Sequence, residues 1–190
     1  MSKLIYENPL GVQENIKDFV FEHVAEISFS NNAMRLSGRR AKDMPAVLWC
    51  PVSFPADIRI EWEFRPLTEP GEATFIFAIK DESAFYISYF RRKNEKDRAF
   101  HMCRLIKDKG QFIVAEGPDP IPDASESLPW YRMCIIKQGS RVTFLENETV
   151  ILDFWDDGIS CGDILTGGSI GFKQSSELTA EYRNLRVTWI

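Results

Sequence analysis

Two glutamates stand two residues apart in the segment DIRIEWEFRPL, at Glu61 and Glu63. In an extended strand, residues two apart share one face, and their Cα atoms are roughly 6.5–7 Å apart. Glycoside hydrolysis needs two carboxyl groups about 5–9 Å apart, one as the general acid and one as the nucleophile or base. The spacing therefore permits this chemistry, with Glu63 and Glu61 as the candidate catalytic residues.

The same pattern also occurs on solvated strands of acidic proteins. Arg59 and Arg65 flank the glutamates on the same predicted face and could neutralise them in a ladder of charges across neighbouring strands. We favour this structural interpretation of the pair and keep the catalytic one as the alternative.

A second candidate lies in the segment SAFYISYFRR, residues 83–92, which reads as a strand. One face would carry Phe85, Ile87 and Tyr89, and the other Tyr86, Ser88, Phe90 and Arg92. If the first face packs in the core, the second presents an aromatic ring, a hydroxyl and a guanidinium. Sugar rings stack on aromatic rings while polar groups hold their hydroxyls, and arginine can pair with a uronate carboxylate. The candidate substrate-binding residues are Trp49, Tyr86, Ser88, Arg91 and Arg92.

The segment RRKNEKDR, residues 91–98, holds five cationic side chains against two acidic ones. This local positive charge could attract an anionic ligand, although a solvated loop between two strands explains it equally well. His101 follows on the next predicted strand and is the third candidate catalytic residue, because imidazole titrates near neutral pH. A lone histidine on a half-buried strand is more often simply held by hydrogen bonds.

The elements that must position these residues are β-strands, because apolar residues recur with period two almost throughout. We expect strands at 27–29, 33–37, 46–50, 57–67, 73–79, 84–91, 99–106, 111–115, 131–137, 141–146, 149–154, 168–173 and 179–189. A short helix is expected only near the N-terminus, in GVQENIKDF. The proline-rich segment 117–130 is predicted to be an extended surface loop. This pattern predicts an all-β protein, a sandwich or a barrel.

Composition limits the classes of function. A chain of 190 residues suits a single domain, 1–190, and a net charge of −5 argues against nucleic acid as the partner. No apolar run approaches the roughly 20 residues of a membrane span, and the N-terminus lacks a secretory signal, so we expect a cytoplasmic protein. Its four cysteines are widely spaced and should be free thiols.

Cofactor chemistry has no support in the sequence. Two histidines and scattered cysteines cannot assemble the usual transition-metal ligand sets without carboxylates, so we expect neither a metal ion nor another cofactor. The string GGSIG has the G-x-S-x-G pattern of a hydrolase nucleophile. However, both histidines precede it and the segment continues as a strand, so it does not fit that role.

Several strings in the chain resemble a known family. YENPL, LWCPVSFP, EWEFRPLTEPG, ISYFRRK, RAFHMCRL and GPDPIPD are similar to the YesU-like family of bacterial proteins, and the C-terminal third resembles the closing half of a concanavalin A-like (laminin-G-like) jelly roll. The resemblance implies a two-sheet antiparallel sandwich with a concave saccharide-binding face, and an association with pectin and rhamnogalacturonan utilisation. It also favours Glu63, Arg91 and Arg92 as site residues. The E-x-D-x-E strand of glucanases with this fold is incomplete here, because a third acid is missing.

Two classes of function follow from these patterns. The first is a protein that binds or processes plant cell-wall oligosaccharides, with or without uronic acids, either as a glycoside hydrolase-like enzyme or without catalysis. The second is a protein-interaction module with no sugar ligand. A homodimer through edge strands is compatible with either. The saccharide hypothesis requires that Glu63, Tyr86 and the paired arginines open onto the same concave side of the sandwich.

Overall fold

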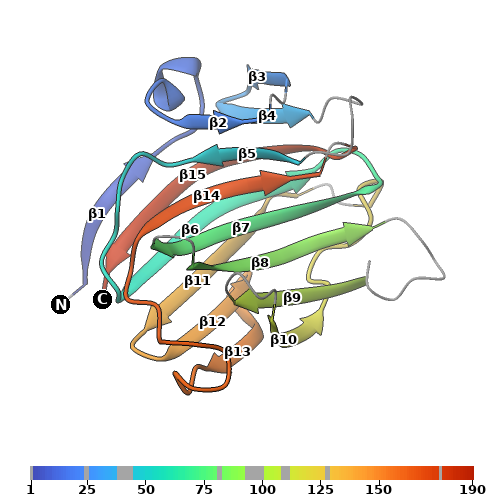
Figure 1. Ribbon diagram of the computed structural model, residues 1–190. Helices are drawn as coiled ribbons and strands as arrows, with labels where there is room; N and C mark the ends of the chain where they lie inside the picture. Colours follow the sequence, from blue (N-terminus) through green and yellow to red (C-terminus); the bar gives the residue numbers. More distant parts are fainter. Residues whose placement is uncertain are drawn as a thin grey trace.

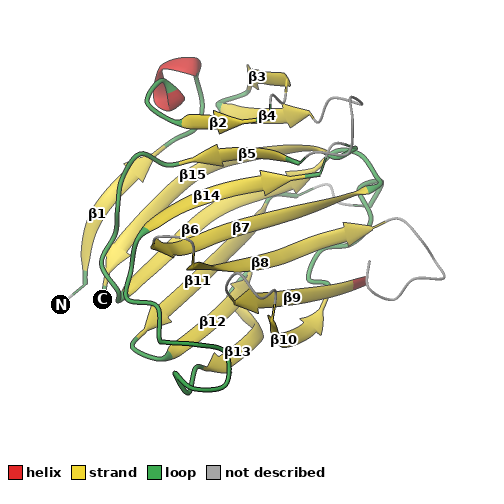
Figure 2. Cartoon of the chain, in the orientation of Figure 1, coloured by secondary structure: helices red, strands yellow, loops and turns green. Residues whose placement is uncertain are grey.

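In the computed structural model the chain folds into two antiparallel sheets (Figures 1 and 2). The structure describes residues 2–23, 26–37, 45–80, 83–92, 101–107, 112–126, 129–175 and 177–190. A short 3-10 helix, η1 (Gln13–Ile16), lies near the N-terminus, where the sequence predicts a short helix. The prediction of a two-sheet, all-β sandwich is confirmed.

Sheet A consists, in spatial order, of β13 (Thr149–Trp155), β12 (Arg141–Glu146), β11 (Tyr131–Gln138), β6 (Ile58–Pro66), β15 (Thr179–Trp189), β4 (Ala33–Ser37) and β3 (Glu26–Ser30), with β1 (Lys3–Asn8) also paired to β15. Sheet B consists of β10 (Phe112–Pro118), β9 (Met102–Lys107), β8 (Ser83–Arg92), β7 (Gly71–Lys80), β14 (Ser169–Gln174), β5 (Ala46–Trp49) and β2 (Val20–Glu22). Strands that follow one another in sequence stay together from β7 to β10 and from β11 to β13.

The core lies between the two sheets because strands of both alternate apolar and polar residues. On β6 every second side chain, from Ile58 to Phe64, is buried, and the intervening charged side chains point away from the core. Trp62 of sheet A stacks on Phe75 of sheet B, with ring centroids 4.3 Å apart. Aromatic packing of this kind joins the two sheets.

Strand β8 departs from the predicted faces at one position. Phe85, Ile87 and Tyr89 are fully buried, as expected, but so is Phe90, which was predicted to share the outer face with Tyr86. A register shift between β7 and β8 pairs Ala73 with Phe90 and the adjacent Thr74 with Ser88, two residues earlier. This β-bulge turns both Tyr89 and Phe90 toward the core.

The proline-rich segment, residues 117–130, is partly buried, although it is predicted to lie on the surface. Strand β10 extends to Pro118, and Ile121, only 1% exposed, packs into the main core. The backbone N–H of Ala124 donates to Glu69 Oε1 at 2.7 Å. The prediction of a surface loop is therefore wrong at Ile121, because an apolar side chain between prolines anchors the segment.

Candidate functional site

The predicted site residues divide between two outer faces of the sandwich. Glu61 and Glu63 lie on β6 of sheet A, whereas Tyr86 and Ser88 lie on β8 of sheet B. In both strands these residues alternate with buried core residues, so their side chains point in opposite directions, away from the shared core. The expectation that Glu63, Tyr86 and the arginines share one concave side is therefore wrong.

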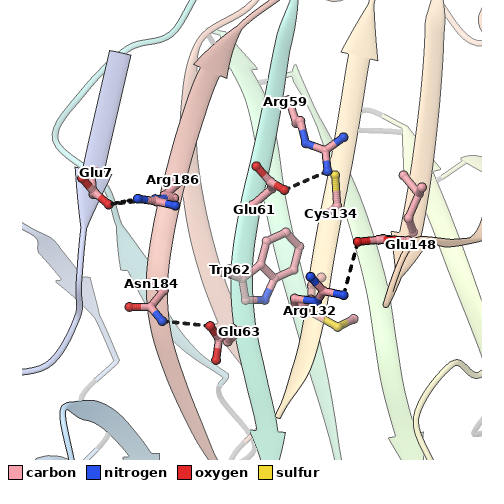
Figure 3. A pocket seen from close by; sticks show the side chains of 12 residues that line it. Glu7, Arg59, Glu61, Trp62, Glu63, Arg132, Cys134, Glu148, Asn184 and Arg186 are labelled. Atoms are coloured by element: carbon pink, nitrogen blue, oxygen red, sulfur yellow. Dashed lines mark hydrogen bonds and ion pairs between the residues drawn. The ribbon is translucent and has the colours of Figure 1, made fainter. Parts of the chain in front are cut away.

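The two glutamates line a hollow of about 390 Å³ on the outer face of sheet A (Figure 3). The lining residues are Glu7, Arg59, Glu61, Trp62, Glu63, Arg132, Met133, Cys134, Leu145, Glu148, Asn184 and Arg186. Most of its charged side chains already have a partner of opposite charge. Within the hollow these pairs are Glu7 with Arg186, Arg59 with Glu61, and Arg132 with Glu148.

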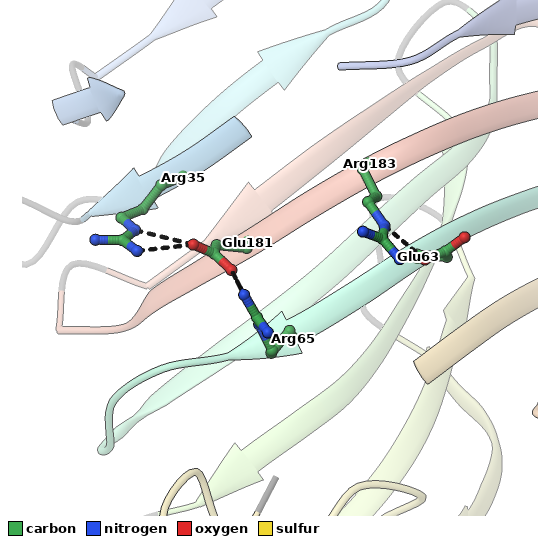
Figure 4. Close-up of polar contacts among 5 residues, drawn as sticks. All are labelled: Arg35, Glu63, Arg65, Glu181 and Arg183. Carbon is green, nitrogen blue, oxygen red and sulfur yellow. Dashed lines mark hydrogen bonds and ion pairs between the residues drawn. The ribbon is translucent and has the colours of Figure 1, made fainter. Parts of the chain in front are cut away.

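Both candidate catalytic carboxylates are held by cationic or amide groups. Arg59 Nη2 lies 2.8 Å from Glu61 Oε1, as the charge-ladder interpretation predicts. Glu63 does not pair with Arg65 but accepts hydrogen bonds from Arg183 Nε at 2.6 Å and from Asn184 Nδ2 at 2.8 Å. The structure thus contains a charge ladder, with a different partner for Glu63 (Figure 4).

Arg65 takes part in a separate buried bridge. The side chain of Glu181 is 2% exposed, and its two carboxylate oxygens accept hydrogen bonds from Arg35 and Arg65 (Figure 4). Burial alone would raise the pKa of Glu181, but the hydrogen bonds from both arginines lower it below its ordinary value. The ring of Trp130 packs against two of these arginines. The guanidinium carbons of Arg65 and Arg183 lie 4.6 and 4.1 Å from its centroid.

These contacts make the hollow on sheet A a poor hydrolase site. Arg59 engages the Glu61 carboxylate, and Arg183 and Asn184 engage that of Glu63, so a substrate oxygen would have to displace these groups to reach either carboxylate. Trp62 is the one aromatic residue among the described lining residues, and it is 1% exposed. Stacking on a sugar ring is therefore not available there. The catalytic roles of Glu61 and Glu63 stay predictions that the geometry does not favour.

The outer face of sheet B carries two partly exposed aromatic rings, Trp49 and Tyr86, in one row across its strands. Trp49 of β5 is in register with Gly171 of β14, Gly171 with Ile76 of β7, and Ile76 with Tyr86 of β8. Three strand spacings therefore separate Trp49 from Tyr86, or roughly 14 Å between their Cα atoms. We call this row, Trp49, Gly171, Ile76 and Tyr86, the aromatic platform.

A small apolar cluster, separate from the main core, holds the platform in place. Its buried members are Val47, Ile76 and Ala84, and Trp49, Ile79 and Tyr86 pack against them half-buried. A Cβ on Gly171 would stand 2.5 Å from Trp49 Cε3, so the indole occupies the space above this glycine. The rings are thus fixed by packing while part of their surface stays open to solvent.

Polar side chains border the platform on one side. Ser88 Oγ donates to Glu72 Oε1 at 2.5 Å and lies 3.2 Å from Thr74 Oγ1. Ser88 is only 2% exposed, so the prediction that its hydroxyl faces a ligand is wrong. It positions the half-exposed carboxylate of Glu72, which the sequence analysis did not single out.

Three cationic side chains are described on this face. Arg91 Nε lies 3.8 Å from Glu72 Oε2, and Arg104 Nε lies 2.7 Å from Glu116 Oε1. Lys173 Nζ lies 5.9 Å from the ring centroid of Tyr86. The alternation Ser169, Gly171, Lys173 in β14 was a signal that Lys173 faces outward on the same side as Gly171, but it does not show which strands lie beside it. The side chain of Arg92 and residues 93–100 lie outside the described residues.

His101 stands at the end of sheet B, directly before β9. It is half-buried, and its carbonyl accepts a hydrogen bond from the N–H of Asp119 at 3.3 Å. The histidine thus connects β9 to the proline-rich segment. Its catalytic role stays a prediction.

Other kinds of site have little support in the described residues. No group of three histidine, cysteine or acidic side chains there is placed to hold a metal ion. Within the same residues no helix is long and apolar enough to cross a membrane. The four cysteines are unpaired, and burial raises the pKa of Cys134 to about 12. This thiol, although it lines the hollow on sheet A, is a weak nucleophile.

Comparisons with known proteins agree with this architecture. The chain matches the family described as "Domain of unknown function (DUF1961)" over residues 3–84 and 79–187. It is 34% identical to the uncharacterized protein YesU of Bacillus subtilis (strain 168), over 96% of this chain and 94% of that protein. A crystal structure of a protein of unknown function with a galectin-like fold from Bacillus subtilis is also 34% identical, with a TM-score of 0.89 over 97% of this chain and 95% of the other.

More distant structures share the fold alone. The carbohydrate-binding module CBM66 from Bacillus subtilis has a TM-score of 0.64 at 13% identity, and covers 90% of this chain and 95% of its own. The carbohydrate recognition domain of Emp46p has a TM-score of 0.68 at 12% identity, over 95% and 93% of the two chains.

Proposed function

The chain belongs to the DUF1961 family, and we propose that it binds saccharides on the outer face of sheet B, through the aromatic platform. The observation that carries this proposal is the single row in which Trp49 and Tyr86 stand at either end, with Gly171 and Ile76 between them. The apolar faces of sugar rings stack on aromatic side chains. A row of roughly 14 Å offers a stacking surface for a short oligosaccharide.

The surroundings of the platform fit such a ligand. Binding sites for polar ligands combine apolar surface with a few fixed polar groups. Here Glu72, positioned by Ser88 and Thr74, offers acceptors for sugar hydroxyls beside the rings. The hollow on sheet A has polar groups but no exposed ring in its described lining, so we do not place the saccharide there.

The fold adds general support. Solved structures named as a carbohydrate-binding module and as a carbohydrate recognition domain share it.

A more specific proposal concerns the ligand, which we expect to be an oligosaccharide derived from pectin or rhamnogalacturonan that contains a uronic acid. Support for this comes from the resemblance of the sequence strings and from the cationic side chain of Lys173 beside the platform. The proposed function is binding, without a catalytic step.

Isothermal calorimetry with a panel of plant cell-wall oligosaccharides, acidic and neutral, tests the proposal. We expect heat of binding with at least one member, and a loss of about tenfold or more in affinity in both Trp49→Ala and Tyr86→Ala. Trp155→Ala is the matched control, because Trp155 is 66% exposed on β13 of sheet A. Its affinity should equal that of the wild type.

Two results would overturn the proposal. The first is an absence of heat across the whole panel for the wild type, which would favour the protein-interaction alternative. The second is full affinity in both platform variants, which would place the saccharide elsewhere on the molecule.

A further inference from the structure

We propose that Lys173 is the residue that recognises the saccharide by its acidic group, so that the ligand places one carboxylate beside the aromatic platform. This inference rests on the proposed function. It specifies that the ligand is negatively charged and that Lys173 binds its charged group. The sequence analysis favoured Arg91 and Arg92 for this role, and the side chain of Arg92 lies outside the described residues.

The argument begins with the charges on the outer face of sheet B. Of the three cationic side chains described there, Arg104 has a carboxylate partner at 2.7 Å, and Arg91 has one at 3.8 Å. Lys173 makes no ion pair with any described residue, and its ammonium lies 5.9 Å from the ring centroid of Tyr86. A carboxylate that binds at Lys173 therefore does not have to displace an acidic side chain of the protein.

The second step concerns position. On β14, Lys173 comes two residues after Gly171, so both face outward on the same side of the strand. In register, Lys173 lies between Val47 of β5 and Thr74 of β7, directly beside the row of the platform. A sugar ring that stacks on the Trp49 indole, which covers Gly171, would have its substituents within reach of the Lys173 ammonium.

The third step concerns the chemistry of the ligand. An ammonium group binds carboxylates by charge-assisted hydrogen bonds, which are about twice as strong as neutral ones. The adjacent carboxylate of Glu72 would repel a second anionic group on that side, so a ligand with a single carboxylate at this subsite fits best. A uronic acid residue combines such a carboxylate with hydroxyls and an apolar ring face.

The test compares trigalacturonate with its fully methyl-esterified form, which differs in charge and leaves the sugar rings unchanged. Calorimetry on the wild type should show at least tenfold tighter binding of the free acid, weakening as the salt concentration rises. Lys173→Gln should lose about tenfold in affinity for the acid and less than twofold for the ester, and Lys173→Arg should retain most of the affinity. Arg104→Gln, which removes a charge already neutralised by Glu116, should change either affinity by less than threefold.

The outcomes separate this inference from the proposed function. If the wild type binds acid and ester equally, or if Lys173→Gln binds the acid with full affinity, the role of Lys173 is refuted while saccharide binding stands. If neither form binds, and no other oligosaccharide of the panel gives heat of binding, the proposed function itself fails.

Discussion

Trp49 occupies the space in which a side chain at position 171 would stand, since a Cβ built on Gly171 lies 2.5 Å from Trp49 Cε3 and 3.0 Å from the carbonyl oxygen of Leu48. Real Cβ contacts are not this short, so the glycine is required for the present position of the indole. The platform thus depends on a residue that has no side chain of its own.

Gly171→Ala should therefore displace Trp49 and reduce saccharide affinity by about tenfold, because the stacking ring moves. The overpacked strand should also lose about 1–3 kcal/mol of unfolding free energy. Tryptophan fluorescence and calorimetry on the same sample would report both effects. Unchanged emission together with unchanged affinity would show that the indole does not need this space.

The buried ion pair between Lys107 and Asp156 connects β9 of sheet B to the segment after β13 of sheet A. Lys107 Nζ lies 2.7 Å from Asp156 Oδ2, and the two side chains are 1% and 2% exposed. Lys107→Met should lower the unfolding free energy by about 3–5 kcal/mol, because it leaves a buried carboxylate without its partner. Urea unfolding measures this change.

An exposed ion pair of sheet A is the matched control for that substitution. The side chains of Arg132 and Glu148 are 66% and 76% exposed and 3.3 Å apart. Arg132→Met should change stability by less than about 1 kcal/mol. Equal effects of the two substitutions would mean that burial does not govern the strength of these pairs.

Glu181 should make stability depend on pH in the acid range. Its pKa in the folded protein is lowered from the ordinary value of 4.5, with Arg35 and Arg65 as the lowering partners. A lowered pKa contributes stability that is fully present above the unfolded-state value and is lost as the pH falls through the folded-state value. The stability difference between the wild type and Glu181→Gln should thus be largest near pH 7 and shrink below about pH 4.5.

Urea unfolding of both proteins between pH 3 and pH 7 gives this comparison. A difference that stays constant over the whole range would show that Glu181 titrates alike in the folded and unfolded chains.

Trp130 stacks over two guanidinium groups on the outer face of sheet A, away from the platform. Trp130→Ala should lower stability by about 1–2 kcal/mol through the loss of two cation–π contacts. Thermal unfolding and calorimetry together separate stability from binding. Saccharide affinity should not change, and a tenfold loss of affinity would instead place the ligand on sheet A.

The alternation of residues along each strand could be read from the sequence, but the assignment of strands to sheets could not. Residues of β6 and β8 alternate in the same way, so Glu63 and Tyr86 were both correctly predicted to face away from the core. Which sheet a strand joins depends on its partners, and β6 pairs with β11 and β15, distant in sequence. Pairing over such separations leaves no local pattern.

Other details were missed for local reasons. Strands β1 and β2 carry mostly exposed residues, so the period-two pattern that predicts a strand is weak there. The bulge that buries Phe90 depends on the register with β7. Lys173 was missed because one strand of mixed composition does not reveal which neighbours its outer face meets.

A crystal structure of the protein with a bound acidic oligosaccharide tests the central claim most directly, because the two candidate faces lie on opposite sides of the sandwich. We predict a sugar ring stacked on the Trp49 indole of the aromatic platform, with its carboxylate within about 3 Å of Lys173 Nζ. Electron density for the saccharide in the hollow beside Glu61 and Glu63, and none on the aromatic platform, would contradict the account.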